Sequence, residues 1–136
     1  MKSHLGFYGG VGSVTGANFM LDTGATAILV DCGLVQGDRF AAEQNAEPFV
    51  YNPADADVLL VTHAHADHIG RIPKLVKDGF SGTIYSTKPT KDLANIMLRD
   101  AVKVMEYEYE RYCYEVLYEN RDIDHALTLW KTVDYH

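Results

Sequence analysis

The segment Thr62–Gly70 places three of the chain's six histidines and one aspartate within six consecutive positions. It follows the apolar run Val58–Val61, which predicts a buried strand. Apolar residues recur at helical spacing from Ile69 onward, so we predict that a helix begins there. Open α/β layers carry their chemistry where strands end and helices begin. This feature therefore restricts the chain to a layered α/β fold with a metal-binding loop.

The spacing within the segment indicates two metal positions. His63 and His65 are two residues apart, so in extended chain they project to the same side and can grip one ion. Asp67 and His68 are neighbours that diverge, and they suit a second ion. This donor set favours Zn²⁺, with Mn²⁺ as the alternative. A solvated loop, or a helix capped by Asp67, would account for a single histidine but not for this cluster.

Charge and cysteine content limit the function classes. The 136 residues carry a net charge of −7, which is wrong for a domain that binds nucleic acid through a basic surface alone. Cys32 and Cys113 match neither a disulfide framework nor a CxxC site, so we expect a reducing, cytoplasmic compartment. No stretch has the apolar length of a signal region or a membrane span, and we expect no membrane association.

The remaining pattern predicts strands leading the chain and then strand–helix alternation, which is typical of α/β layers. The predicted strands are 5–8, 17–22, 27–30, 57–62 and about 83–85. The predicted helices are 67–78, a long one from Thr87 or Thr90 to about Tyr118, and a last one at about 122–131. Residues 34–53 are predicted to be irregular, because Pro48 and Pro53 interrupt them.

Two further features have open interpretations. Asp31 ends a predicted strand before a glycine, so it is either a turn former or a carboxylate that orients a ligating histidine. The glycine-rich segment 9–16 lacks a phosphate-loop lysine and leads into a strand, so we interpret it as a flexible loop beside the metal site. The histidines outside the cluster are treated as structural: His4, His125 and His136.

The long predicted helix is rich in tyrosine. Its members are Tyr107, Tyr109, Tyr112, Tyr114 and Tyr118. They are either core plus ordinary surface residues, or a surface for a partner, for a missing domain or for a second copy in a homo-oligomer. Stacking on RNA is disfavoured, because glutamates alternate with these rings.

The histidine segment resembles the HxHxDH signature of the metallo-β-lactamase fold. Segments 12–16, 28–37 and 67–75 resemble the β-CASP branch of that fold, which contains RNA-processing nucleases. The similarity continues through the long helix and so covers most of the chain. The resemblance implies an αββα layered domain of which residues 1–136 are the amino-terminal part.

The resemblance also implies roles for individual residues. His63 and His65 would hold one zinc ion, and Asp67 and His68 a second. Asp67 would also handle a proton of the attacking water, and Asp31 would match a supporting aspartate of the family. In such enzymes the two ions activate water for in-line attack on an RNA phosphodiester.

The chain departs from the family pattern after His68. The family requires a further histidine, an aspartate that bridges both metals and a last histidine beyond an inserted β-CASP domain. Only His125 and His136 follow, and neither lies in a glycine-flanked segment. We therefore expect the rest of the domain and the insertion to be absent and this chain to be inactive alone. The alternatives are a hydrolase of another ester, thioester or lactam, and a non-catalytic metal- or partner-binding chain.

Overall fold

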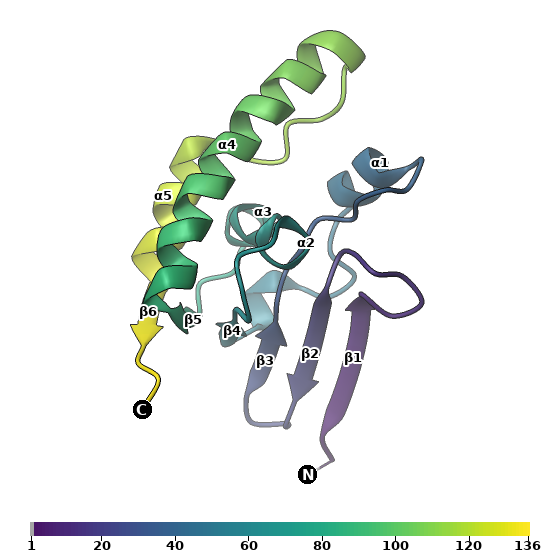
Figure 1. The fold of residues 1–136 in the computed structure, drawn as a ribbon. Coiled ribbons are helices and arrows are strands. Elements are labelled where there is room, and N and C mark those ends of the chain that lie inside the picture. Colours follow the sequence, from purple (N-terminus) through teal and green to yellow (C-terminus); the bar gives the residue numbers. More distant parts are fainter. Residues whose placement is uncertain (1) are drawn as a thin grey trace.

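The computed structural model describes residues 2–136, which form one six-stranded sheet with helices (Figure 1). The strands are β1 (His4–Gly9), β2 (Asn18–Asp22), β3 (Ala27–Val30), β4 (Val58–Leu60), β5 (Thr83–Thr87) and β6 (Trp130–Val133). Their order in the sheet is their order in the sequence. Strands β1, β2 and β3 form an antiparallel meander, whereas β3 to β6 run parallel. Each parallel pair is joined by a helical crossover, as parallel pairing requires.

The hydrophobic core lies between the sheet and one layer of helices. Leu29, Leu59 and Ile84 are neighbours across β3, β4 and β5, and all three are fully buried. Ile72 and Leu75 of α3 (Ile72–Lys77) belong to the same cluster. The apolar strand and helix patterns therefore meet in a single core, and the predicted α/β class is confirmed.

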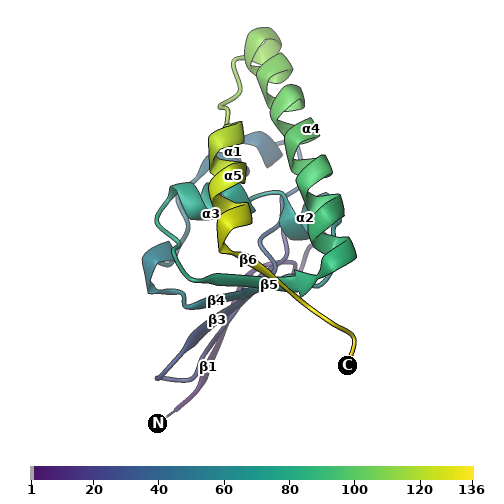
Figure 2. The same cartoon turned by 90° about the vertical axis from the view of Figure 1, so that its left-hand side faces the viewer.

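The opposite face of the sheet is apolar and has no helix over it. Alternation along β1, β2 and β4 puts Leu5, Phe7, Leu21 and Leu60 on this face, and each is between 38% and 58% exposed. In Figure 2, the helices of residues 2–136 lie above the sheet and none lies below it. Of the expected αββα arrangement, the described residues thus form one helical layer and one sheet.

The segment predicted to be irregular contains two short helices. They are α1 (Ala41–Ala46) and the 3-10 turn η1 (Pro53–Asp55). The Asn45 side chain is buried and bonds to both backbone groups of Val35, which ties α1 to the preceding loop. A six-residue helix stabilised by such a tertiary contact has little periodicity to detect in the sequence.

The helix predicted over 67–78 is two helices, α2 (Ala66–Ile69) and α3, separated at Gly70 and Arg71. The chain after β3 causes this break. Cys32 accepts a hydrogen bond from the Arg71 amide and donates one to the His68 carbonyl, each at 2.9 Å. These two bonds hold the end of α2 and the residue after it against the chain that follows β3.

The last two helix predictions are wrong at their ends. Helix α4 (Lys88–Tyr112) ends at Cys113, whose left-handed backbone (φ +58°) stops the helix six residues before its predicted end. Helix α5 (Asn120–Leu129) ends before Trp130, which begins β6 and pairs with Ile84. The end of α5 is not visible in helical periodicity, because it depends on the pairing of Trp130 with the distant Ile84.

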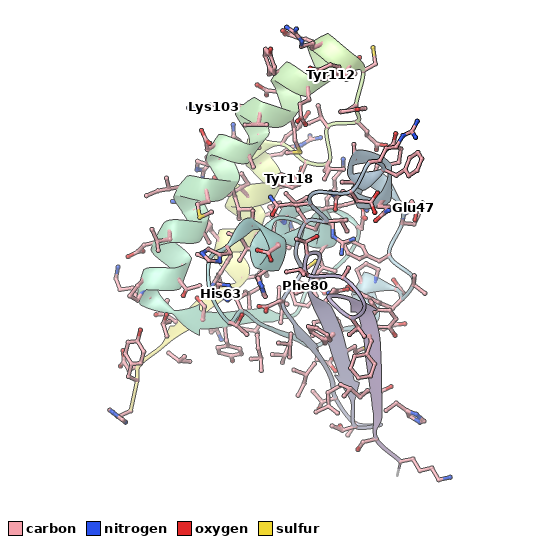
Figure 3. The ribbon with its side chains drawn as sticks, turned by 45° about the vertical axis from the view of Figure 1, so that its right-hand side comes forward. Glu47, His63, Phe80, Lys103, Tyr112 and Tyr118 are labelled. Atoms are coloured by element: carbon pink, nitrogen blue, oxygen red, sulfur yellow. The ribbon has the colours of Figure 1, made fainter. Side chains whose placement is uncertain are left out.

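The predicted tyrosine-rich helix is only partly correct. Tyr107, Tyr109 and Tyr112 lie on α4, each more than half exposed, and Tyr114 follows the helix. Tyr118 is fully buried, and its hydroxyl donates to the Gly70 carbonyl at 2.9 Å. Figure 3 shows Tyr112 at the far end of α4 and Tyr118 in the body of the domain.

Among residues 2–136, no helix combines the length and the apolar character needed to cross a bilayer.

Candidate metal centre

The predicted ligands lie where β4 ends and α2 begins. After β4 the chain remains extended as far as His65, which caps α2 with φ −69° and ψ 145°. His63 therefore precedes the helix, whereas Asp67 and His68 lie within its first turn. Figure 3 shows His63 at the foot of α4, beside α2.

The structure brings all four predicted ligands together. The ring centroids of His63 and His65 are 4.8 Å apart, and those of His63 and His68 are 4.1 Å apart. His68 Nε2 lies 3.5 Å from a carboxylate oxygen of Asp67. The rings of His63 and His68 thus lie closer than the expected pairing implies, and the division of ligands between two ions stays a prediction.

Asp31 is buried beneath this cluster and bonds directly to it. Its side chain is 3% exposed and accepts three hydrogen bonds, from the Thr62 amide at 2.8 Å, the Thr62 hydroxyl at 2.7 Å and His68 Nδ1 at 2.7 Å. Its φ of +57° lies in the left-handed region, where aspartate is more readily accommodated than most residues. Asp31 thus shares the geometry of a turn former, but its carboxylate contacts a predicted ligand.

The bond to Asp31 determines which nitrogen of His68 is free. An ionised carboxylate only accepts, so this contact requires a proton on His68 Nδ1, and in the neutral ring the lone pair is then at Nε2. Nε2 is the atom that faces Asp67. Metal-ligating histidines commonly donate their other nitrogen to a carboxylate in this way.

Thr62 does the same for His63, a role that the sequence analysis missed. The threonine hydroxyl has a single proton and lies 2.7 Å from Asp31 Oδ2, so it donates there. It then accepts from His63 Nδ1, 2.9 Å away, and in the neutral ring this leaves His63 Nε2 free. The sequence signal for this role was the hydroxyl residue, Thr62, directly before the first histidine of the cluster. One carboxylate therefore orients two imidazoles.

The glycine-rich segment 9–16 reaches the cluster through its end. The Ala17 amide donates to the Asp67 carbonyl at 3.0 Å, and the Thr15 hydroxyl bonds to the backbone of Gln36. Gly16 has φ +75° and no room for a side chain against Val35. The residue that follows the segment thus contacts the candidate metal centre, and the segment leads into β2 without forming a helix terminus.

The donor chemistry fits zinc, although the site is not preorganised. Three imidazole nitrogens and one carboxylate are ligands that Zn²⁺ accepts. Within residues 2–136, however, no three histidine, cysteine, aspartate or glutamate side chains stand in a geometry that would hold an ion as they are. Cys32 is not a candidate donor, because it is fully buried and burial raises the pKa of its thiol to about 12.

Histidines that contact a buried carboxylate at the carboxyl end of a parallel strand are the arrangement expected of a metal-dependent α/β domain. The chain belongs to the metallo-β-lactamase superfamily, whose family model matches residues 12–130. The resemblance inferred from the histidine segment and its flanks is thereby confirmed.

Similar proteins include three that are named for RNA-related roles. "Ribonuclease TTHA0252" of Thermus thermophilus is 38% identical over 94% of this chain. "Transcription termination factor FttA" of Methanocaldococcus jannaschii is 34% identical over 95% of it. "Cleavage and polyadenylation specificity factor subunit 3-I" of Arabidopsis thaliana is 33% identical over 80% of it. The matched regions cover 27%, 20% and 15% of these relatives, respectively.

Proposed function

We propose that this chain carries the amino-terminal part of a zinc-dependent hydrolase that cleaves RNA phosphodiester bonds. One observation carries the proposal: the buried Asp31 carboxylate contacts Nδ1 of His68 and, through the Thr62 hydroxyl, Nδ1 of His63, which would leave both Nε2 atoms for a metal ion. The names of the relatives support RNA as the substrate. Two zinc ions in the complete site, or manganese in their place, remain part of the proposal.

Each side chain has a defined task in this scheme. His63, His65, Asp67 and His68 would hold the ions, and Asp31 would keep two of the imidazoles in the binding tautomer. When bound, such ions polarise a phosphoryl oxygen and lower the pKa of water. The Asp67 carboxylate, which is partly exposed beside His68 Nε2, would accept a proton from an attacking water.

Two other functions remain open. One is hydrolysis of another ester, thioester or lactam, because the family match names the superfamily and not the substrate. The lack of a preorganised three-ligand site in residues 2–136 favours a chain that binds metal weakly, or binds only a partner. Location in a reducing cytoplasm is also proposed, and it is supported by two free cysteines.

The test is zinc per chain, measured by elemental analysis after dialysis, in the wild type, His65→Ala and His125→Ala. His125 is exposed and lies outside the cluster, so its replacement is the matched control. We expect bound zinc to decrease only in His65→Ala. Equal zinc content in all three proteins would contradict the metal centre.

The substrate is tested with the zinc-loaded chain and a protein extended to the length of its relatives. Cleavage of single-stranded RNA, but not of a thioester or a lactam, by the extended protein is the expected result. The opposite preference would favour the second function. Zinc binding without cleavage of any of these substrates by the extended protein would favour the third.

A further inference from the structure

A groove of about 650 Å³ separates α4 from α1. It begins at Ala66, next to the candidate metal centre, and continues along α4 to the segment 114–117. From Ile96 to Glu108 the helix rises about 18 Å, which is the length of about three turns of a second helix. Figure 1 shows α1 and the segment after α4 on the same side of α4. The groove is therefore long enough to receive an extended or helical peptide.

The groove side of α4 is a second apolar stripe. Ala94, Leu98 and Val102 are buried in the core of the domain. Met97 and Val104 line the groove seven residues apart, and they are 37% and 49% exposed. A helix that packs on one side only needs one such stripe. Within residues 2–136, no helix or strand packs into the groove against Met97 and Val104.

The charged groups that line the groove are all acidic. They are Asp100, Glu108 and Glu115. No lysine, arginine or histidine lines it, and within the described chain none of the three carboxylates has an ion-pair partner. Arg99, next to Asp100 in the sequence, is paired with Asp124 of α5. Lys103, three positions after Asp100, lies on the side of α4 away from α1 (Figure 3).

We propose that this groove binds a polypeptide segment whose apolar side chains are flanked by lysine or arginine. The stripe would bury the apolar side chains, and the three carboxylates would pair with the basic flanks. RNA does not match the groove, because phosphates would face carboxylates. A symmetric contact with a second copy does not match either, because the acidic positions of one copy would face those of the other.

The test uses two synthetic peptides with the same leucines at positions i, i+3, i+4 and i+7. One carries lysine and arginine at its flanks, and the other carries glutamate. Asp100→Lys with Glu108→Lys reverses the charge in the groove. Glu106→Lys with Glu110→Lys changes the net charge equally, on exposed positions of the same helix that do not line the groove.

Fluorescence anisotropy should show binding of the basic peptide only. Its affinity should fall about tenfold in the groove variant and by less than about twofold in the control variant. Equal losses in both variants, or no binding of the basic peptide by the folded wild type, would overturn the proposal. So would sedimentation that shows a dimer dissociated by the groove variant, because a second copy would then occupy the groove. Zinc content should be unchanged in both variants, which keeps this test separate from that of the metal centre.

Discussion

Asp31 and His68 are 37 positions apart in the sequence, yet the aspartate carboxylate lies 2.7 Å from the histidine Nδ1. The contact forms because β3 and β4 are parallel neighbours, so the residues that follow them meet at one edge of the sheet. The same carboxylate bonds the Thr62 amide and hydroxyl. The candidate metal centre is therefore supported from a strand that carries none of its predicted ligands.

Replacing Asp31 by asparagine should weaken zinc binding by about 10–100-fold, because the amide cannot hold His68 in the same tautomer as firmly as a carboxylate. A chelator competition titration measures the change. Asp134→Asn, at an exposed position near the carboxyl end, should leave the affinity unchanged. Equal affinities in the wild type and Asp31→Asn would refute the orienting role.

The Thr62 hydroxyl should matter in the same assay. Thr62→Val keeps the shape but removes the link between Asp31 and His63, and zinc affinity should fall by about tenfold. Thr62→Ser retains the hydroxyl and should restore most of the affinity. If serine and valine were equally defective, the methyl group rather than the hydroxyl would be responsible.

Gly33 should not tolerate a side chain. A Cβ there would lie 1.6 Å from the Asp67 carbonyl oxygen, so the chain after β3 would have to move away from α2. Gly33→Ala should lower the free energy of unfolding by about 3 kcal/mol, measured by urea denaturation. Gly37→Ala meets open space at φ +74° and should cost only about 1 kcal/mol.

Tyr118 should contribute to stability through its hydroxyl. Tyr118→Phe leaves the buried Gly70 carbonyl without this donor and should cost about 1 kcal/mol, which thermal unfolding would detect. Tyr135 is 75% exposed, and Tyr135→Phe should change stability by less than about 0.5 kcal/mol. Similar effects of the two substitutions would mean that the buried hydrogen bond contributes nothing.

The two cysteines should differ in reactivity. Burial raises the pKa of Cys32 to about 12, whereas Cys113 is exposed. Iodoacetamide at pH 8 should modify Cys113 alone, as mass spectrometry of the folded chain would show. The unfolded Cys32 thiol ionises near pH 9.0 and the folded one near 12, so its ionisation should lower stability as the pH rises between these values. In the iodoacetamide experiment, rapid modification of Cys32 in the folded chain would contradict its burial.

Local sequence determined strands β1 to β5, the ligand segment and the first turn that carries Asp67 and His68, whereas β6 was predicted as the end of a helix. The alternation of apolar and polar residues in strands, and their spacing in helices, are properties of a few adjacent residues, so they can be recognised without knowledge of the fold. The run of donors was equally local. It was sufficient to infer the family, the α/β class and the cluster at the end of β4.

Tertiary structure alone decided how that cluster is supported and where several elements end. The Asp31–Thr62–His63 chain of hydrogen bonds, the break at Gly70 and the burial of Tyr118 all join residues that lie about 30 to 50 positions apart or depend on such contacts. No periodicity records these contacts, because the side chains meet only after parallel strands have brought distant segments to one edge of the sheet.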